Sequence, residues 1–234
     1  MISISMKNVE KSFGENKVLR GVTFETHEGE IFGLLGPSGS GKTTIINILT
    51  KQLTADSGEC HVAARSDEIG LMLEHDGLWG SLSALDNLIV FEDIYKIPRE
   101  HTLRALESVG LSDAKKTNAD SLSKGMRQRL VLARATLHKP KNLFLDEPTS
   151  ALDPVTARGI YELIRKLRDN GSTVFLTTHN MEEATNLCDR VVMLHGGVII
   201  EQGAPKEICE KYNAMKTLPD LESVFVQLTG GGLL

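Results

Sequence analysis

The segment 36–44, with the sequence GPSGSGKTT, constrains the fold more than any other part of the chain. It follows the short apolar run EIFGLLG, which is typical of a buried strand, and a helix is predicted directly after it over 43–52. Its three glycines allow backbone N–H groups to point inward without a Cβ in the way. The start of the following helix adds positive potential at the same point. The segment is therefore predicted to bind phosphate groups.

The residue types in this segment match the P-loop pattern G-x-x-x-x-G-K-[ST] in the strand-to-helix context that the pattern requires. Lys42 is predicted to reach the β- and γ-phosphates of a nucleotide, Thr43 to offer its hydroxyl to Mg²⁺, and Thr44 to bind the α-phosphate. The alternative is a glycine-rich turn with an accidental lysine, which the neighbouring strand and helix disfavour. The predicted phosphate-binding residues are Gly36, Pro37, Ser38, Gly39, Ser40, Gly41, Lys42, Thr43 and Thr44.

The segment NLFLDEPTSALD supplies the second half of a nucleotide site. Its apolar start predicts a buried strand, and Asp146 and Glu147 come at the carboxyl end, where open α/β sheets place their ligands. Asp146 is predicted to hold Mg²⁺, usually through water, because this ion prefers oxygen ligands. Glu147 is predicted to accept a proton from an attacking water molecule. The alternative is a pair of surface acids that begin a loop.

His179 follows another apolar strand, TVFLTT, at the same predicted edge of a sheet. This position favours a role in sensing or orienting the γ-phosphate. The alternative is a structural histidine.

Composition restricts the classes of protein to which the chain can belong. The net charge of −5 argues against nucleic-acid binding through general electrostatics. The three cysteines (Cys60, Cys188 and Cys209) form no spaced cluster and suggest reduced thiols in the cytosol. The first residues lack the apolar core of a signal peptide, and no apolar run approaches the roughly 18 residues of a membrane span. A role at a membrane would therefore require docking onto another chain.

Strands and helices alternate along most of the sequence, which predicts a parallel sheet covered on both faces. From about 80 to 137 the character changes to helical periodicity, in ALDNLIVFEDIYK, EHTLRALESVG and MRQRLVLARATL, so we expect an inserted helical subdomain. Gly14 and Gly29 are predicted to mark turns. The predicted strands are 2–9, 18–26, 30–35, 59–64, 68–73, 142–146, 173–178, 190–195 and 198–203.

The segment LSKGMRQR, residues 122–129, predicts a helix start with an unusual charge. Ser123 is a good N-cap, but Arg127 and Arg129 add positive charge to a helix end that is already positive. We expect this helix end to face an anion. The alternative is that the two arginines form a solvated face.

The motifs GPSGSGKTT, LSKGM, LFLDEP, SALD and TTH occur in an order and spacing that resembles the ABC-type ATP-binding cassette, over essentially the whole chain. The resemblance implies an α/β fold: a P-loop NTPase (RecA-like) core with an antiparallel β subdomain and an inserted α-helical subdomain. It implies one ABC ATP-binding domain over 1–234. The implied parts are a core of 1–78 and 138–215, a helical subdomain of 79–137 with the LSKGM signature, and a tail of 216–234.

The same resemblance implies a head-to-tail dimer that closes on ATP and opens after hydrolysis. In it, Ser123 and Gly125 contact the γ-phosphate of the nucleotide held by the second cassette. Asp153, in SALD, lies at the dimer seam and couples the two sites. Phe13 matches the aromatic residue that stacks on adenine in this family, with packing in the core as the alternative.

One position departs from the family pattern. Glu74 stands where family members usually carry glutamine, and its carboxylate adds a third acid to Asp146 and Glu147 and a further ligand for Mg²⁺. This variant is similar to cassettes of lantibiotic and bacteriocin self-protection exporters, and the LSKGM signature to those of drug exporters. We hypothesise that Glu74 couples the site to a membrane partner through residues 75–79. Trp79 is expected either to insert into that partner or to be buried.

The sequence thus predicts the ATPase subunit of an exporter of an antibiotic, a lantibiotic or bacteriocin peptide, or a drug. We expect it to use ATP and Mg²⁺, to pair with a second ATP-binding subunit, and to dock onto integral membrane permease subunits at the inner face of the cell membrane. No nucleic-acid partner is expected. The alternatives are a soluble ABC protein acting on nucleic acid or ribosomes, the ATPase of an importer, and a non-hydrolysing sensor.

Overall fold

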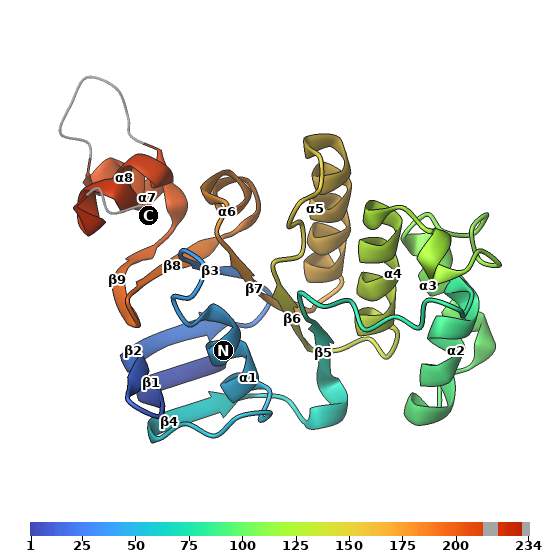
Figure 1. The fold of residues 1–234 in the computed structure, drawn as a ribbon, viewed down its shortest axis with the longest axis horizontal. Coiled ribbons are helices and arrows are strands. Elements are labelled where there is room, and N and C mark those ends of the chain that lie inside the picture. Colours follow the sequence, from blue (N-terminus) through green and yellow to red (C-terminus); the bar gives the residue numbers. More distant parts are fainter. Residues whose placement is uncertain (213–219, 231–234) are drawn as a thin grey trace. The chain divides into compact units, whose positions relative to one another are not determined.

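The computed structural model describes residues 1–212 and 220–230 (Figure 1). The chain forms two compact units, the first from 1–63 with 173–234 and the second from 64–172. The partition into 1–78, 79–137, 138–215 and 216–234 stays a prediction. Residues 216–219 and 231–234 of the predicted tail lie outside the described residues.

The first unit contains an antiparallel sheet with the strand order β2-β1-β4. Strand β1 (Ile2–Phe13) pairs with β2 (Asn16–His27) on one side and with β4 (Ser57–Val62) on the other. Gly14 has a φ of 59° in the turn between β1 and β2, as the turn prediction requires. This sheet confirms the antiparallel β subdomain, although β1 runs four residues beyond the predicted 2–9.

The first unit also contains four strands in the order β7-β3-β8-β9. Strand β3 (Ile31–Leu35) is parallel to β7 (Thr173–Thr178) and to β8 (Arg190–His195), whereas β9 (Val198–Gly203) is antiparallel to β8. Every residue of β3 and β7 is buried, as expected for strands with both faces covered. The helices of this unit are α1 (Lys42–Leu49), α6 (Met181–Leu187), α7 (Pro205–Lys211) and α8 (Leu221–Thr229).

Three stacked aromatic rings form the centre of the first unit's core. Phe24, Phe32 and Phe175 come from β2, β3 and β7, and each pair of ring centroids is 5.5–5.8 Å apart. All three side chains are buried. The rings therefore hold the antiparallel sheet against the parallel strands.

The second unit joins a short parallel strand pair to helices. Strand β5 (Ile69–Met72) pairs with β6 (Asn142–Asp146). Three helices lie within 80–137, as expected for a helical subdomain, and Leu88, Leu106 and Leu130 pack in one apolar cluster between them. The helices of this unit are α2 (Ala84–Tyr95), α3 (Arg99–Ser108), α4 (Lys124–Thr136) and α5 (Pro154–Asp169), with 3₁₀ turns η1 (Ser66–Glu68) and η2 (Ala119–Ser121).

The aromatic stack predicts a large effect of one truncation. Phe175→Ala removes the ring that contacts both other rings, and a cavity of this kind is expected to lower the free energy of unfolding by about 3–5 kcal/mol. Chemical denaturation followed by circular dichroism measures the change. Val155→Ala, at a side chain that is 81% exposed, is the control and should stay within about 0.5 kcal/mol of the unsubstituted protein. Equal effects of the two substitutions would contradict the assignment of the core.

Candidate functional site

The glycine-rich loop leaves the buried strand β3 and enters helix α1 at Lys42, as the sequence predicts. Gly39 and Gly41 have φ values of 79° and 107°, in the region that only glycine adopts without strain. A Cβ on Gly36 would lie 2.3 Å from the carbonyl oxygen of Leu194. The conformation of the loop therefore depends on glycine at these three positions.

Lys42 lies inside the curve of this loop. Its side chain is buried, and Nζ donates to the carbonyl oxygens of Gly36 at 2.7 Å and Pro37 at 3.1 Å. Thr43, the next residue, is exposed. An ammonium group, a hydroxyl and the N–H groups at a helix start make a donor set that fits a polyphosphate with a divalent cation.

The two predicted acids lie at the carboxyl end of β6 in the second unit. Asp146 is the last residue of the strand and is buried, whereas Glu147 is partly exposed. Glu147 has a φ of 51°, which is uncommon for a residue other than glycine. Backbone strain of this kind concentrates at functional sites, because the surroundings must hold it in place. Within residues 1–212 and 220–230, no three His, Cys, Asp or Glu side chains form a metal-binding group.

Phe13 and His179 are both exposed on the first unit. Phe13 ends β1 with 51% of its side chain accessible, and Nζ of Lys11 lies 5.6 Å from its ring centroid. The alternative in which Phe13 packs in the core is therefore wrong. His179 directly follows β7, as predicted.

Ser123 and Gly125 lie at the start of α4, where the sequence predicts them. The Ser123 hydroxyl accepts the N–H of Met126 at 3.3 Å, so the N-cap prediction is confirmed. Gly125 is buried, and a Cβ there would come within 2.4 Å of Cγ2 of Thr156 on α5. The close packing of α4 on α5 therefore requires glycine at this position.

Asp153 caps helix α5. Its Oδ1 accepts the N–H groups of Val155 and Thr156 at 3.0 Å, and Oδ2 accepts the hydroxyl of Thr156 at 2.5 Å. Hydrogen bonds to the Thr156 side chain and backbone lower the pKa of the Asp153 carboxyl. Asp153 thus has a structural role within the second unit, and its predicted role at a dimer seam stays a prediction.

Arg127 does not form a solvated face. Its guanidinium is partly buried against the carboxylate of Asp76, which lies in the loop after β5. The anion that Arg127 faces is therefore a side chain of the same unit. The alternative in which the two arginines form a solvated face is wrong for Arg127.

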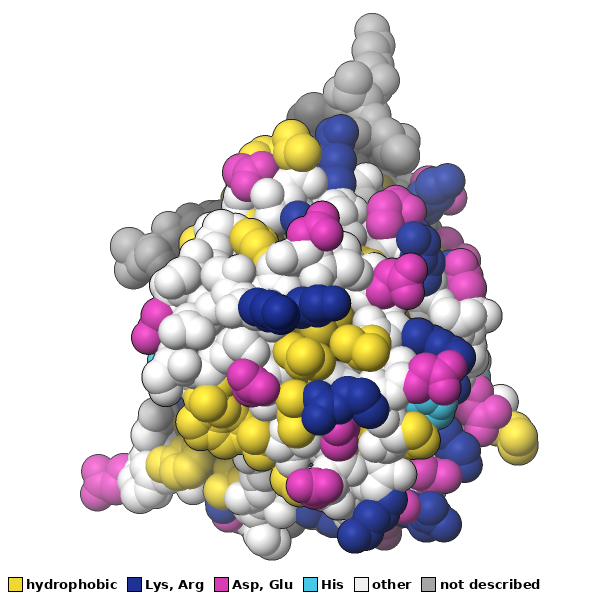
Figure 2. All heavy atoms as spheres, turned by 90° about the vertical axis from the view of Figure 1, so that its right-hand side faces the viewer, with side chains coloured by type: hydrophobic (Ala, Val, Ile, Leu, Met, Phe, Trp, Pro, Cys, Tyr) yellow, Lys and Arg dark blue, Asp and Glu magenta, His cyan; other side chains and the backbone are white. Residues whose placement is uncertain are grey.

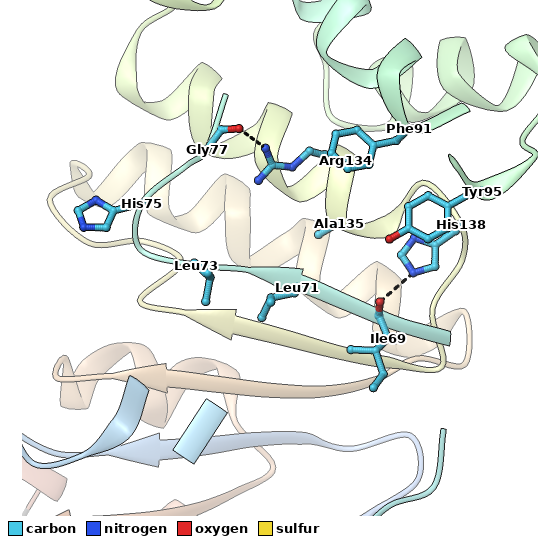
Figure 3. Close-up of a pocket in the computed structure, with 10 residues that line it drawn as sticks. All are labelled: Ile69, Leu71, Leu73, His75, Gly77, Phe91, Tyr95, Arg134, Ala135 and His138. Carbon is cyan, nitrogen blue, oxygen red and sulfur yellow. Dashed lines mark hydrogen bonds between the residues drawn. The ribbon is translucent and has the colours of Figure 1, made fainter. Parts of the chain in front are cut away.

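An apolar cavity of about 380 Å³ lies beside this loop in the second unit (Figure 3). Tyr95 stacks on His138 with ring centroids 4.2 Å apart, and Nε2 of His138 bonds the carbonyl oxygen of Ile69 at 3.0 Å. Burial lowers the pKa of His138, so the ring is neutral near pH 7 and donates from Nε2. The lining residues are Ile69, Leu71, Leu73, His75, Gly77, Phe91, Tyr95, Arg134, Ala135 and His138.

Apolar side chains near this cavity are open to solvent. Trp79 is 46% exposed and its ring centroid lies 6.1 Å from that of Phe91, so the expectation of a fully buried Trp79 is wrong. Val90 and Ile94 on α2 are also exposed. Figure 2 shows hydrophobic side chains gathered among charged ones on the face to which α2 and α3 contribute. Glu74, in the same loop as Trp79, is exposed.

Residues 19–150, more than half of the chain, match the family model described as ABC transporter. The chain belongs to the ABC transporter family. Its ATP-binding cassette is an ATPase domain with a P-loop NTPase fold. Among the described helices, none has the length and apolar character needed to cross a membrane.

Three known proteins show how similar the cassette is to its relatives. It is 31% identical to the linearmycin resistance ATP-binding protein LnrL of Bacillus subtilis, over 98% of this chain and 76% of that protein. It is 40% identical to a fluoroquinolones export ATP-binding protein of Mycobacterium tuberculosis, over 81% of this chain and 66% of that protein. The dimeric post-hydrolysis structure of the ATP-binding cassette MJ0796, bound to ADP and Pi, is 28% identical with a TM-score of 0.78, over 86% and 98% of the two chains.

Sequence reasoning missed the groups that surround the Glu74 loop. Asp76 lies two residues after Glu74, and its partner Arg127 is 51 residues away in the chain. A single sequence shows no pattern for such a pair. The spacing of Arg127 and Arg134, seven residues apart on one helix face, is the one signal that could have suggested a shared partner.

The exposure of Phe13 leads to a prediction about nucleotide affinity. If its ring stacks on adenine, Phe13→Ala should weaken ATP binding by about 5- to 150-fold, since stacking contributes roughly 1–3 kcal/mol per base. Equilibrium dialysis with ATP measures the affinity. Phe13→Tyr keeps the aromatic face and should bind like the unsubstituted protein. Unchanged affinity of the alanine variant would remove Phe13 from the site.

Proposed function

We propose that this cassette is the ATPase subunit of an exporter and that it works as a dimer on separate membrane subunits. The observation that carries the proposal is the glycine-dependent loop with Lys42 inside it, at the start of α1. The names of two relatives, which concern linearmycin resistance and fluoroquinolone export, favour a small antibiotic or drug as the transported compound. The net charge of −5 favours a transporter over a nucleic-acid-binding ABC protein.

The chemistry follows from the residues already described. The loop N–H groups and Lys42 bind the phosphates of ATP. Thr43 and Asp146 would hold Mg²⁺, with Glu74 as a further acidic ligand. Bound Mg²⁺ supplies positive charge that offsets the charge on the phosphates. Glu147 accepts the proton of a water molecule whose oxygen bonds to the γ-phosphorus, while the bond to the β–γ bridging oxygen breaks and ADP leaves. His179 orients the γ-phosphate.

Assembly adds the second half of the proposed site. The start of α4, with the hydroxyl of Ser123 and the backbone at Gly125, faces the γ-phosphate in a partner cassette, with Asp153 at the seam. The dimeric structure of the cassette MJ0796 bound to ADP and Pi supports the pairing of two cassettes. Departure of the cleaved phosphate removes the bridging contact, so the dimer opens once phosphate has left.

The apolar cavity and the loop beside it are the proposed contact with the membrane subunits. Apolar lining residues and the exposed side chains of Trp79 and Ile94 are features of a protein-docking surface. The proposed location is the inner face of the cell membrane.

The proposed chemistry predicts that one variant binds ATP but hydrolyses it slowly. Glu147→Gln removes the proton acceptor but keeps the shape of the side chain, so kcat should fall by about 10²–10⁴-fold while ATP still binds. Phosphate release and equilibrium dialysis measure the two properties. Glu162→Gln, at an exposed acid on α5 that pairs with Arg165, is the matched control and should hydrolyse ATP normally. Normal hydrolysis by Glu147→Gln would remove Glu147 from the role of base.

A second prediction concerns Glu74. Glu74→Gln should change ATP turnover stimulated by the membrane subunits by about 2- to 30-fold, the range of a coupling change of roughly 0.5–2 kcal/mol, and should alter ATP affinity less. The measurement compares the cassette alone with the cassette copurified with its membrane subunits. Glu107→Gln, at an exposed acid on α3, is the control. Loss of ATP binding with normal transport per bound ATP would contradict the coupling role.

A further inference from the structure

The loop between β5 and α2 is fastened to helix α4 by the side chain of Arg127. Its Nε donates to Oδ2 of Asp76 at 2.8 Å, and Nη2 lies 2.7 Å from the same oxygen. Its Nη1 donates to the carbonyl oxygen of Ala119 at 2.9 Å. One guanidinium therefore joins the loop, the turn η2 and α4, all within the second unit.

Arg134, seven residues further along α4, binds the backbone of the same loop. Its Nη2 donates to the carbonyl oxygen of Asp76 at 2.6 Å, and Nη1 donates to that of Gly77 at 2.8 Å (Figure 3). Residues seven apart lie on the same helix face. Asp76 is thus held by α4 through both its side chain and its backbone.

The hydrogen-bonded ion pair between Asp76 and Arg127 is stronger than an ion pair on the open surface. The Asp76 carboxylate accepts the N–H of Leu78 at 3.1 Å through Oδ1 and contacts the Arg127 guanidinium through Oδ2, so both of its oxygens have a partner. The two side chains are 25% and 28% exposed, so solvent screens the pair less than an open surface pair.

We propose that Arg127 is a positioning residue that makes the loop carrying Glu74 and the helix end carrying Ser123 move as one body. Ser123 begins α4 one helical turn before Arg127, so a displacement at either end reaches the other through a single rigid turn. This inference rests on the proposed function, in which Ser123 meets the nucleotide of a partner cassette and the loop meets a membrane subunit. Arg127 then transmits the state of the nucleotide to the docking surface.

The single tryptophan of the chain makes the inference testable. Trp79 lies three residues after Asp76 and is half exposed, so its fluorescence emission reports the surroundings of the loop. In the Glu147→Gln protein, addition of Mg·ATP should change this emission. Adding Arg127→Ala should abolish most of the change, while equilibrium dialysis shows that ATP still binds.

Further variants separate the positioning role from a general loss of structure. Asp76→Asn removes the charge but keeps the shape, so it should give the same loss of response, and combination with Arg127→Ala should add nothing. If Arg127→Ala fails to fold in a thermal melt, Asp76→Asn alone carries the test. Arg104→Ala, at an exposed arginine that pairs with Glu100 on α3, should keep the full response.

An ATP-induced emission change that is equal with and without Arg127→Ala would overturn the inference. Absence of any change in the Glu147→Gln reference protein, with ATP bound, would also overturn it, because the loop would then not follow α4. Failure of the reference protein to bind ATP would instead contradict the proposed function on which the inference rests. The dialysis measurement keeps these two failures apart.

Discussion

The proposed function depends on the close approach of a glycine-rich backbone to an anion at the start of helix α1. Gly36, Gly39 and Gly41 permit that approach, since a Cβ at Gly36 would overlap a neighbouring carbonyl and the other two have positive φ values. The N–H groups and the helix end then present positive potential that a polyphosphate can satisfy. Lys42, folded into the loop, adds a full charge at the same place. In the proposed function this loop binds a triphosphate, and the remaining motifs take their chemical roles from that binding.

Helix α4 also carries positive charge, but two of its arginines bind groups of the protein itself. Its arginines do not all face the nucleotide, because Arg127 near its start and Arg134 in its last turn both bind the loop that contains Asp76. The helix end itself, with the exposed Ser123, remains available for the proposed partner. The start of α4 and the Arg127 side chain, one turn further along, thus have different roles. The ionised cap at Asp153 shows that a motif residue can also stabilise a helix within its own unit.

Much of the fold could be predicted from local patterns. The strands over 142–146, 173–178, 190–195 and 198–203 match their predicted bounds, because each is a short, nearly continuous apolar run next to a turn signal. The sequence predicts β1 too short, because residues 10–13 lack such a run and are extended by pairing with β2, where Phe13 pairs with Asn16. Pairing of this kind is a tertiary effect that composition does not show.

The residues of the candidate site also fall into those that the sequence predicts and those that it does not. The phosphate loop, the acids after β6 and the cap at Ser123 could be predicted because neighbouring residues carry the signal. The pair of Asp76 and Arg127, the exposure of Trp79 and the apolar cavity depend on residues that are distant in sequence and adjacent only in the fold.

The central claim is that one ATP molecule joins two cassettes, held by the loop of one and by the Ser123 helix end of the other. Sedimentation of a hydrolysis-deficient protein with Mg·ATP and with Mg·ADP tests it most directly. We expect a dimer with ATP and a monomer with ADP, because only ATP carries the bridging phosphate. A monomer with both nucleotides at high protein concentration, or a dimer that forms equally well with ADP, would contradict the claim.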